Sequence, residues 1–291
     1  MSRPRGILLV AGAATVWSSG GLIARLVATD AWTTTMWRCV FASLFLLAYV
    51  GLVRRQGVVA QWRAIGWPGL AVAACLAAAS TCFILSLSRT SVANTLILMS
   101  VGPWVAGLLG WLILGERVPA RTWLTMGIAL GGVVIMVSGS YGAGRLAGDV
   151  LAIMMATAFA MATVLVRRHP EIQMTPAASL GATLAGLAAA PMASPWSASP
   201  GDLALLALFG IAQFGVGFVL FTAGARLLPV AESSLIGMLE TVLGPLWVWL
   251  LLDEAPAARS IVGGAVILGA LVLHTLLDVT APRRAASPQE A

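Results

Sequence analysis

The chain has 291 residues, of which 59% are hydrophobic and 10% are charged, whereas soluble domains have roughly 25% charged residues. A soluble protein of this size could not bury so much apolar surface, so the composition excludes that class and indicates a multispanning membrane protein. The net charge is +6, and every basic residue is Arg. The Arg residues are spread over short gaps between apolar segments, which argues against a nucleic-acid partner.

Ten apolar segments follow one another along the chain, and a membrane-spanning helix takes about 20 residues. The first begins near the N-terminus, but it is too long for a signal peptide and lacks a clear cleavage site. Residues 281–291 are predicted to form a disordered cytoplasmic tail. We predict spans at 6–26, 32–53, 66–87, 91–114, 120–139, 148–166, 174–194, 203–224, 231–252 and 258–277.

The placement of Arg predicts the orientation in the membrane. If the N-terminus is inside, the cytoplasmic gaps and ends hold Arg3, Arg5, Arg54, Arg55, Arg63, Arg117, Arg121, Arg167, Arg168, Arg226, Arg283 and Arg284. The opposite side then holds only Arg25, Arg89, Arg145 and Arg259. Because cytoplasmic loops are enriched in Arg and Lys, we expect both termini to be cytoplasmic, in the inner (plasma) membrane.

An internal repeat organises the chain. Residues 92–116 and 230–254 both begin with Val-Ala, continue as a Leu-rich apolar run and end in Glu. The segment ATVW at 14–17 is similar to ATAF at 156–159. These echoes predict an all-α membrane protein with ten transmembrane helices as two five-helix repeats.

The repeats are placed at 1–144 and 145–280. Because five is odd, the second repeat must insert with the opposite orientation. Inverted repeats of this kind are typical of secondary transporters, whose substrate site lies near the middle of the bilayer between the halves.

Several of the repeated segments carry a family resemblance: WLILGERVP (111–119), GIALGGVVIM (127–136), WLLLDEAP (249–256), AVILGALVLH (265–274) and ATVWSSGGLIARL (14–26). The chain resembles the drug/metabolite transporter superfamily in its EamA-type ten-helix branch, and within that branch the YddG-type aromatic amino acid exporters. Thr241 departs from the family, which usually has Pro after the ninth-helix Glu. The resemblance implies export of amino acids, including aromatic ones, and of related small metabolites by alternating access.

Glu240 is the single carboxylate in the middle of the ninth predicted span. A charge at the bilayer centre costs roughly 2.5–3.5 kcal/mol on insertion scales, so Glu240 should face the interior of the bundle. It is interpreted as a contact for the ammonium group of a substrate or as a proton-coupling group. The alternatives are a buried hydrogen bond and an ion pair with Arg38.

Other residues deep in the spans are candidates for a substrate site. Pro103 and Pro245 each free a backbone carbonyl in mid-span, which predicts either a bent cavity wall or a packing kink. Trp17 and Phe159 are repeat partners that either sandwich an apolar side chain or simply pack, and the polar residues either line the site or join helices. The predicted substrate-binding set is Trp17, Ser18, Ser80, Asn94, Gly102, Pro103, Phe159, Thr163, Gln213 and Glu240.

No signal for an enzyme, a metal site or a cofactor is found. Cys39, Cys75 and Cys82 lie inside apolar runs and are expected to be small core residues. HExxH, GxSxG and P-loop motifs are absent. Two alternatives remain: an exporter of other solutes such as drugs or nucleotide sugars, and an intramembrane enzyme that uses Glu240 but lacks a second catalytic group.

Small residues recur with helical spacing in the fifth and tenth spans, as Gly127-x-x-x-Gly131 and Ala265-x-x-x-Gly269. This pattern predicts close helix packing, either of these two spans on each other or between two copies of the chain. We favour a monomer in the lipid bilayer, with a homodimer as the alternative, because the two halves can satisfy each other's interface.

Overall fold

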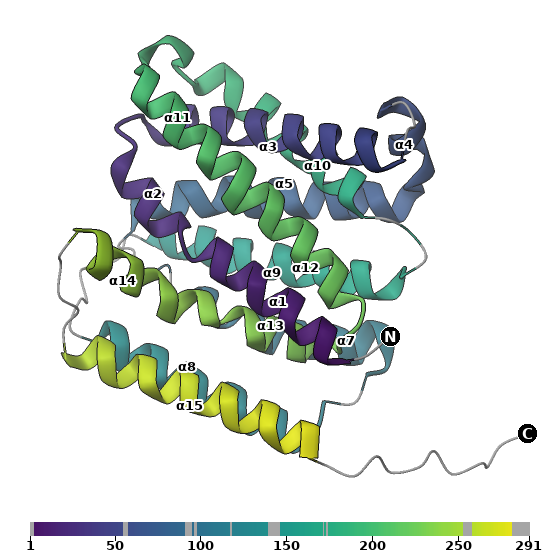
Figure 1. The fold of residues 1–291 in the computed structure, drawn as a ribbon, viewed down its shortest axis with the longest axis vertical. Helices are drawn as coiled ribbons and strands as arrows, with labels where there is room; N and C mark the ends of the chain where they lie inside the picture. The colour runs from purple at the N-terminus through teal and green to yellow at the C-terminus, as the bar shows by residue number, and fades with distance from the viewer. Residues whose placement is uncertain are drawn as a thin grey trace, which may run out of the picture.

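The computed structural model describes residues 3–54, 58–90, 95, 98–116, 118–138, 146–170, 172, 174–252 and 258–280, and these form helices with no strand (Figure 1). The first half contains α1 (Arg3–Trp17), α2 (Gly20–Leu26), α3 (Ala31–Arg54), α4 (Val58–Ala64), α5 (Gly66–Arg89), α7 (Gly102–Leu114) and α8 (Ala120–Val137). The second half contains α9 (Leu146–Arg168), α10 (Thr175–Ala189), η1 (Ala190–Met192), η2 (Pro195–Ser197), α11 (Pro200–Leu208), η3 (Phe209–Val216), α12 (Gly217–Ala225), α13 (Val230–Gly237), α14 (Leu239–Leu252) and α15 (Ala258–Thr280).

Helices are found in all ten apolar segments that the sequence predicts as spans. Six helical segments are long and apolar enough to cross a membrane: Arg3–Leu26, Ala31–Leu52, Gly66–Arg89, Leu146–Arg168, Pro200–Ala225 and Val230–Leu251. Three more apolar helices are shorter: Gly102–Leu114, Ala120–Ile135 and Ile261–Leu273. The chain therefore contains membrane-spanning helices, and the count of ten crossings stays a prediction.

The seventh predicted span is shorter in the structure than the sequence predicts. Helix α10 has 15 residues and ends at Ala189, whereas the sequence predicts a span over 174–194. Pro191 and Pro195 lie in the short 3-10 turns that follow. Pro cannot continue an α-helix, because it lacks the backbone N–H and its ring clashes with the preceding turn.

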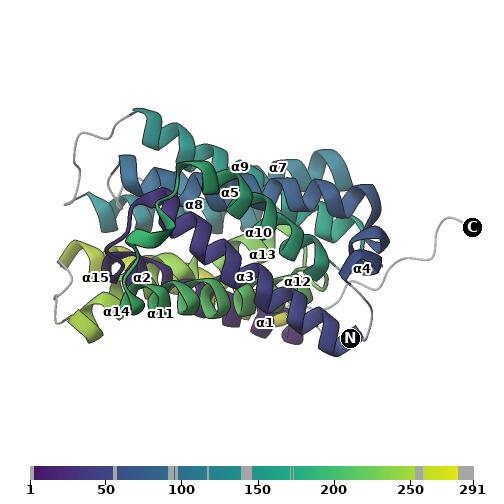
Figure 2. The same ribbon diagram turned by 90° about the horizontal axis from the view of Figure 1, so that it is seen from above.

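Helix packing follows the same pattern in both halves. Helix α1 packs against α12 and α13, and its counterpart α9 packs against α5 and α7. Helix α3 packs against η3, and its counterpart α10 packs against α5. The remaining large contacts join counterparts to each other: α3 with α10, α7 with α13, and α8 with α15 (Figures 1 and 2). Exchanging the two halves thus leaves the contact pattern unchanged, as expected for two structural repeats.

The repeats run in opposite directions, and polar contacts at one end of the molecule show this. Arg3 at the start of α1 pairs with Glu232 at the start of α13, with Nη2 and Oε1 2.9 Å apart. Glu116, just after the end of α7, pairs with Arg167 at the end of α9 at 3.0 Å and accepts a hydrogen bond from the N–H of Val230. Helices α1 and α9 are therefore antiparallel, and so are α7 and α13.

Helices α8 and α15 pack together, but not through the small-residue pattern that the sequence suggests. Gly127, Gly131 and Gly269 are exposed. The contact uses the neighbouring face instead, where a Cβ on Gly132 would lie 2.8 Å from Ile267 Cγ1. The apolar core around this contact includes Ala129 and the larger side chains of Met126, Val133, Ile267 and Leu271. The larger apolar surface therefore determines which helix face is buried.

Three of the predicted spans are broken near their middles. The first breaks at Ser18–Ser19, the fourth at Ser100–Val101, and the ninth at Met238. The last two breaks occupy the same position in the two repeats. In the fourth span Pro103 lies at the start of α7. In the ninth span Thr241 stands at the place of Pro103, and its hydroxyl donates to the carbonyl of Met238. The break in the ninth span thus occurs without Pro at this position, together with a hydrogen bond from a Thr side chain to the backbone of the preceding turn.

The eighth span contains a π-helical segment, η3, between α11 and α12. Its close approach to α3 requires glycine, since a Cβ on Gly210 would lie 2.3 Å from the carbonyl oxygen of Arg38. π-helical turns are rare and occur often at functional sites. Here the segment brings Phe209, Gln213 and Phe214 close to the middle of the bundle.

Candidate functional site

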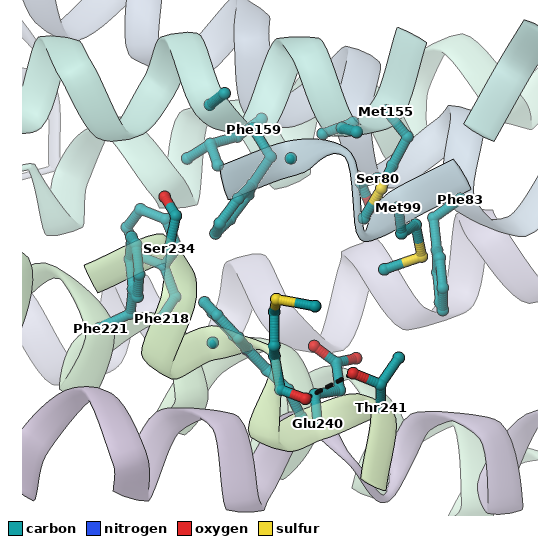
Figure 3. Close-up of a pocket in the computed structure, with 18 of the residues that line it drawn as sticks. Ser80, Phe83, Met99, Met155, Phe159, Phe218, Phe221, Ser234, Glu240 and Thr241 are labelled. Atoms are coloured by element: carbon teal, nitrogen blue, oxygen red, sulfur yellow. Dashed lines mark hydrogen bonds between the residues drawn. The ribbon is translucent and has the colours of Figure 1, made fainter. Parts of the chain in front are cut away.

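A cavity of about 170 Å³ lies between the two halves (Figure 3). About 10–15 Å³ suffices for one buried water molecule, so there is room for a small solute. The first half contributes Trp17, Arg38, Leu76, Ala79, Ser80, Phe83, Met99, Ser100, Gly102 and Pro103. The second half contributes Met155, Ala156, Phe159, Ala160, Gln213, Phe214, Phe218, Phe221, Ser233, Ser234, Gly237, Met238, Glu240 and Thr241.

An aromatic cluster forms one side of the cavity. The ring centroids of Trp17 and Phe159 are 5.4 Å apart, edge to face, and Phe221 lies 5.1 and 5.2 Å from them. Trp17 fits because residue 217 is glycine, since a Cβ there would lie 2.3 Å from Trp17 Nε1. Trp17 and Phe159 contact each other directly, so in this structure they form one wall rather than the two faces of a sandwich.

Glu240 lies in the cavity wall at the start of α14, next to the break at Met238 (Figure 3). No group in the described part of the chain donates a hydrogen bond to its carboxylate or pairs with it. The alternatives of a buried hydrogen bond and an ion pair with Arg38 are therefore not observed among these residues. A carboxylate in an apolar environment is costly unless it is paired, so this group suits a positively charged partner inside the cavity.

Arg38 reaches the cavity from α3, and only 2% of its surface is exposed. Its Nη2 donates to the hydroxyl of Ser80, and its Nε has no partner. Three rings surround the guanidinium carbon: Phe209 at 4.9 Å, Phe214 at 5.4 Å and Phe83 at 5.8 Å from the ring centroids. The cavity therefore contains both a buried cation and a carboxylate, and within the described residues these two groups do not form an ion pair.

Gln213 adds a further polar group. Its Nε2 donates to the carbonyl oxygen of Trp17 at 3.3 Å, which stabilises the end of α1, while its Oε1 has no partner. Buried polar atoms are nearly always hydrogen-bonded in native proteins, so an unpartnered acceptor in a cavity wall is suited to a ligand donor.

Most of the predicted substrate-binding residues meet at this cavity. Seven of them line it: Trp17, Ser80, Gly102, Pro103, Phe159, Gln213 and Glu240. Ser18 lies beside it and accepts a hydrogen bond from Trp247 Nε1 at 2.7 Å. Thr163 donates to the carbonyl of Phe159 within α9 and does not reach the cavity. Asn94 lies outside the described residues.

Several cavity residues are not in the predicted set. Phe214, Phe218 and Phe221 are spaced four and three apart in the eighth span, which places them on one helix face, so this spacing was a usable signal. Met99, Met155 and Met238 had no such signal, because Met is common throughout apolar helices.

Metal ligands do not gather at the cavity. Within the described ranges, no group of three or more His, Cys, Asp or Glu side chains could hold a metal ion. Cys39 and Cys82 are buried and Cys75 is half-buried, and all three are free thiols.

The sequence profile of the EamA-like transporter family matches residues 4–138 and, a second time, residues 143–276. The chain belongs to the EamA-like transporter family. The family belongs to the drug/metabolite transporter superfamily and consists of transporters of small solutes, not enzymes. The cavity between two family repeats is thus a cavity in a multi-pass membrane transporter.

The crystal structure of another protein is similar to this EamA-like transporter, with a TM-score of 0.81. The two sequences are 19% identical over 96% of this chain and 100% of the other. This likeness extends over nearly the whole chain and shows the fold alone. None of the curated proteins matches the sequence.

Proposed function

We propose that this EamA-like transporter exports amino acids, including aromatic ones, and related small metabolites across the inner membrane. The observation that carries the proposal is the composition of the cavity between the halves. An aromatic wall of Trp17, Phe159 and Phe221 faces the same space as the unpaired carboxylate of Glu240. These surfaces are complementary to an apolar side chain and an ammonium group in one small molecule.

Each group has a defined role in the proposal. Trp17 and Phe159 contact the apolar side chain of the cargo, and Glu240 accepts hydrogen bonds from its ammonium group. Ser80 and Gln213 add neutral polar contacts at the cavity wall. A charge-assisted hydrogen bond contributes about 1.5–3 kcal/mol, which is enough for the carboxylate to select amines.

Transport proceeds by alternating access of the two halves around the cavity. The pairs Arg3–Glu232 and Arg167–Glu116 both connect the halves at the end of the molecule where α1 begins. Ion pairs of this kind can break and re-form as one half rocks against the other. In the proposed orientation this end is cytoplasmic, as the excess of Arg on that side favours, and the transporter acts as a monomer.

Transport in proteoliposomes tests the proposal. Purified protein should exchange external radiolabelled L-phenylalanine for unlabelled phenylalanine loaded inside, at a rate above that of protein-free vesicles. A parallel thermal-shift panel of amino acids, nucleotide sugars and cationic drugs identifies the cargo class. No exchange of any amino acid above empty vesicles would make the amino-acid assignment wrong, and stabilisation by drugs or nucleotide sugars alone would replace it.

A further inference from the structure

Arg38 has a position that the proposed roles above do not explain. It is the only basic residue among the buried side chains of the described chain. A guanidinium stays protonated in proteins, and a buried charge is costly unless it is paired. None of the carboxylates within the described ranges forms an ion pair with Arg38.

The contacts around Arg38 satisfy it only in part. A guanidinium has five N–H donors in one plane. Nη2 donates to Ser80, and Nε has no partner. The rings of Phe83, Phe209 and Phe214 stabilise the positive charge through cation–π attraction. Aromatic rings are weak hydrogen-bond acceptors, so the Nε donor of Arg38 has no partner, although Arg38 lines the cavity.

The ligand that fits this arrangement is a carboxylate. Its two oxygens match the parallel donors of a guanidinium, and the match is strongest where water is excluded. We propose that Arg38 is the residue with which this transporter recognises a carboxylate group of its cargo. The inference deepens the proposed function and rests on it: a carboxylate at Arg38 and an ammonium at Glu240 together define a zwitterionic cargo.

The assignment gives the charged and polar groups of the cavity different roles. Glu240 and the unpartnered Oε1 of Gln213 are acceptors and suit an ammonium group. Arg38 is a donor and suits an acid. An amine without a carboxylate should therefore bind weakly, because it leaves the buried guanidinium without a partner.

Binding of three matched probes to the full chain in detergent tests the inference. L-phenylalanine carries both groups, L-phenylalaninamide lacks the carboxylate, and 3-phenylpropionate lacks the ammonium. We expect the wild type to bind phenylalanine at least tenfold more tightly than the amide, and to bind 3-phenylpropionate measurably. Arg38→Gln should abolish the preference and leave the affinity for the amide unchanged. Arg38→Lys keeps the charge without the fork and should keep a weaker preference.

Arg63→Gln is the matched control, because Arg63 is exposed on α4 and outside the cavity. It should keep the full preference. Equal wild-type affinity for the acid and the amide overturns the inference, as does a tenfold preference that survives in Arg38→Gln, or no binding of either carboxylate probe. If Arg38→Gln does not fold, the wild-type comparison and Arg38→Lys still decide.

The two proposals fail in different ways. Preferential binding of phenylalanine without transport would contradict export and leave the role of Arg38 intact. Transport of phenylalanine and its amide with equal affinity would support a transporter of amines and contradict the role of Arg38.

Discussion

At the scale of single residues, the carboxylate of Glu240 is the group whose replacement is most informative. Glu240→Gln keeps the size of the side chain and removes its negative charge, so the fold should be preserved. If the carboxylate binds an ammonium group, affinity for L-phenylalanine should fall by about 1.5–3 kcal/mol, which is roughly 10–150-fold. Isothermal calorimetry on folded protein measures this change.

The same variant separates binding from proton coupling. If Glu240 carries a proton instead, Glu240→Gln should keep its affinity for phenylalanine but lose any dependence of transport on a pH gradient. We favour the binding role, because downhill export of an accumulated metabolite needs no driving ion. Unchanged affinity and flux, with and without the gradient, would make Glu240 a packing residue.

Asp30 provides a residue-scale prediction outside the spans. Its Oδ1 accepts hydrogen bonds from the N–H groups of Trp32 and Thr33, so it caps the start of α3. Partial burial opposes ionisation, but the hydrogen bonds from Thr33 and Trp32 outweigh it and lower the pKa of Asp30. The stabilisation is fully present above the ordinary carboxyl pKa and is lost as the pH falls through the lowered pKa.

Thermal unfolding between pH 7 and pH 3 measures this effect. Part of the acid loss of stability in the wild type should be absent in Asp30→Asn, because Asn also caps helices but does not titrate. Identical pH profiles for the two proteins would show that the ionisation of Asp30 does not contribute to stability.

At the scale of helices, glycine lets α12 approach α1. In Gly217→Ala the new methyl group would lie 2.3 Å from Trp17 Nε1. We expect overpacking to destabilise the protein by about 1–3 kcal/mol and to weaken phenylalanine binding, because Trp17 must move.

Gly21→Ala is the matched control, with no atom within 4 Å of the new methyl group. It should be neutral or stabilise by up to about 1 kcal/mol. Equal effects of both changes on unfolding would contradict the packing argument.

The connection of α7 to α9 and α13 is another helix-scale feature that can be measured. Glu116 pairs with Arg167 and accepts from the Val230 N–H. The side chains of Glu116 and Arg167 are 25% and 31% exposed, so water partly screens their attraction. Glu116→Gln should therefore lower the free energy of unfolding by only about 0.5–2 kcal/mol. A double-mutant cycle with Arg167→Gln should give a coupling energy of at least about 0.5 kcal/mol. Additive effects in the cycle would show that the pair does not hold this end together.

The sequence predicts the helices better than their irregularities. Apolar segments and the echo between residues 92–116 and 230–254 are enough to place helices in all ten predicted spans. The break at Met238 is not predicted, because the side-chain hydrogen bond of Thr241 that accompanies it is one that many Thr residues in helices could make. The π-helical segment η3 depends on packing against α3, which is a tertiary contact.

The cavity was only partly predictable for the same reason. Glu240 and Trp17 stand out because carboxylates and Trp are unusual in the middle of a span. Thr163 and Ser18 are hydroxyl residues in apolar spans, as Ser80 is, but they do not line the cavity. Thr163 donates a hydrogen bond within α9, and Ser18 accepts one from Trp247. Which polar residue faces a cavity depends on the rotation of each helix, and the apolar pattern fixes this rotation poorly when every side is apolar.

At the scale of the whole molecule, the proposed transport requires that the cavity between the two repeats is the cargo site. The residues that line it come from both halves, and the inter-half ion pairs lie at one end of the bundle. Filling the cavity should therefore stop transport without dismantling the fold. Ser234 on α13 lines the cavity and is only half-buried, so a larger side chain there can enter the space.

The decisive measurement is counterflow of L-phenylalanine in proteoliposomes with the wild type, Ser234→Trp and Leu187→Trp. Leu187 is 66% exposed on α10, so its variant adds the same side chain outside the cavity. We expect exchange by the wild type and by Leu187→Trp, and at least a tenfold slower rate for folded Ser234→Trp. Exchange at the wild-type rate by folded Ser234→Trp would contradict the assignment of this cavity as the cargo site.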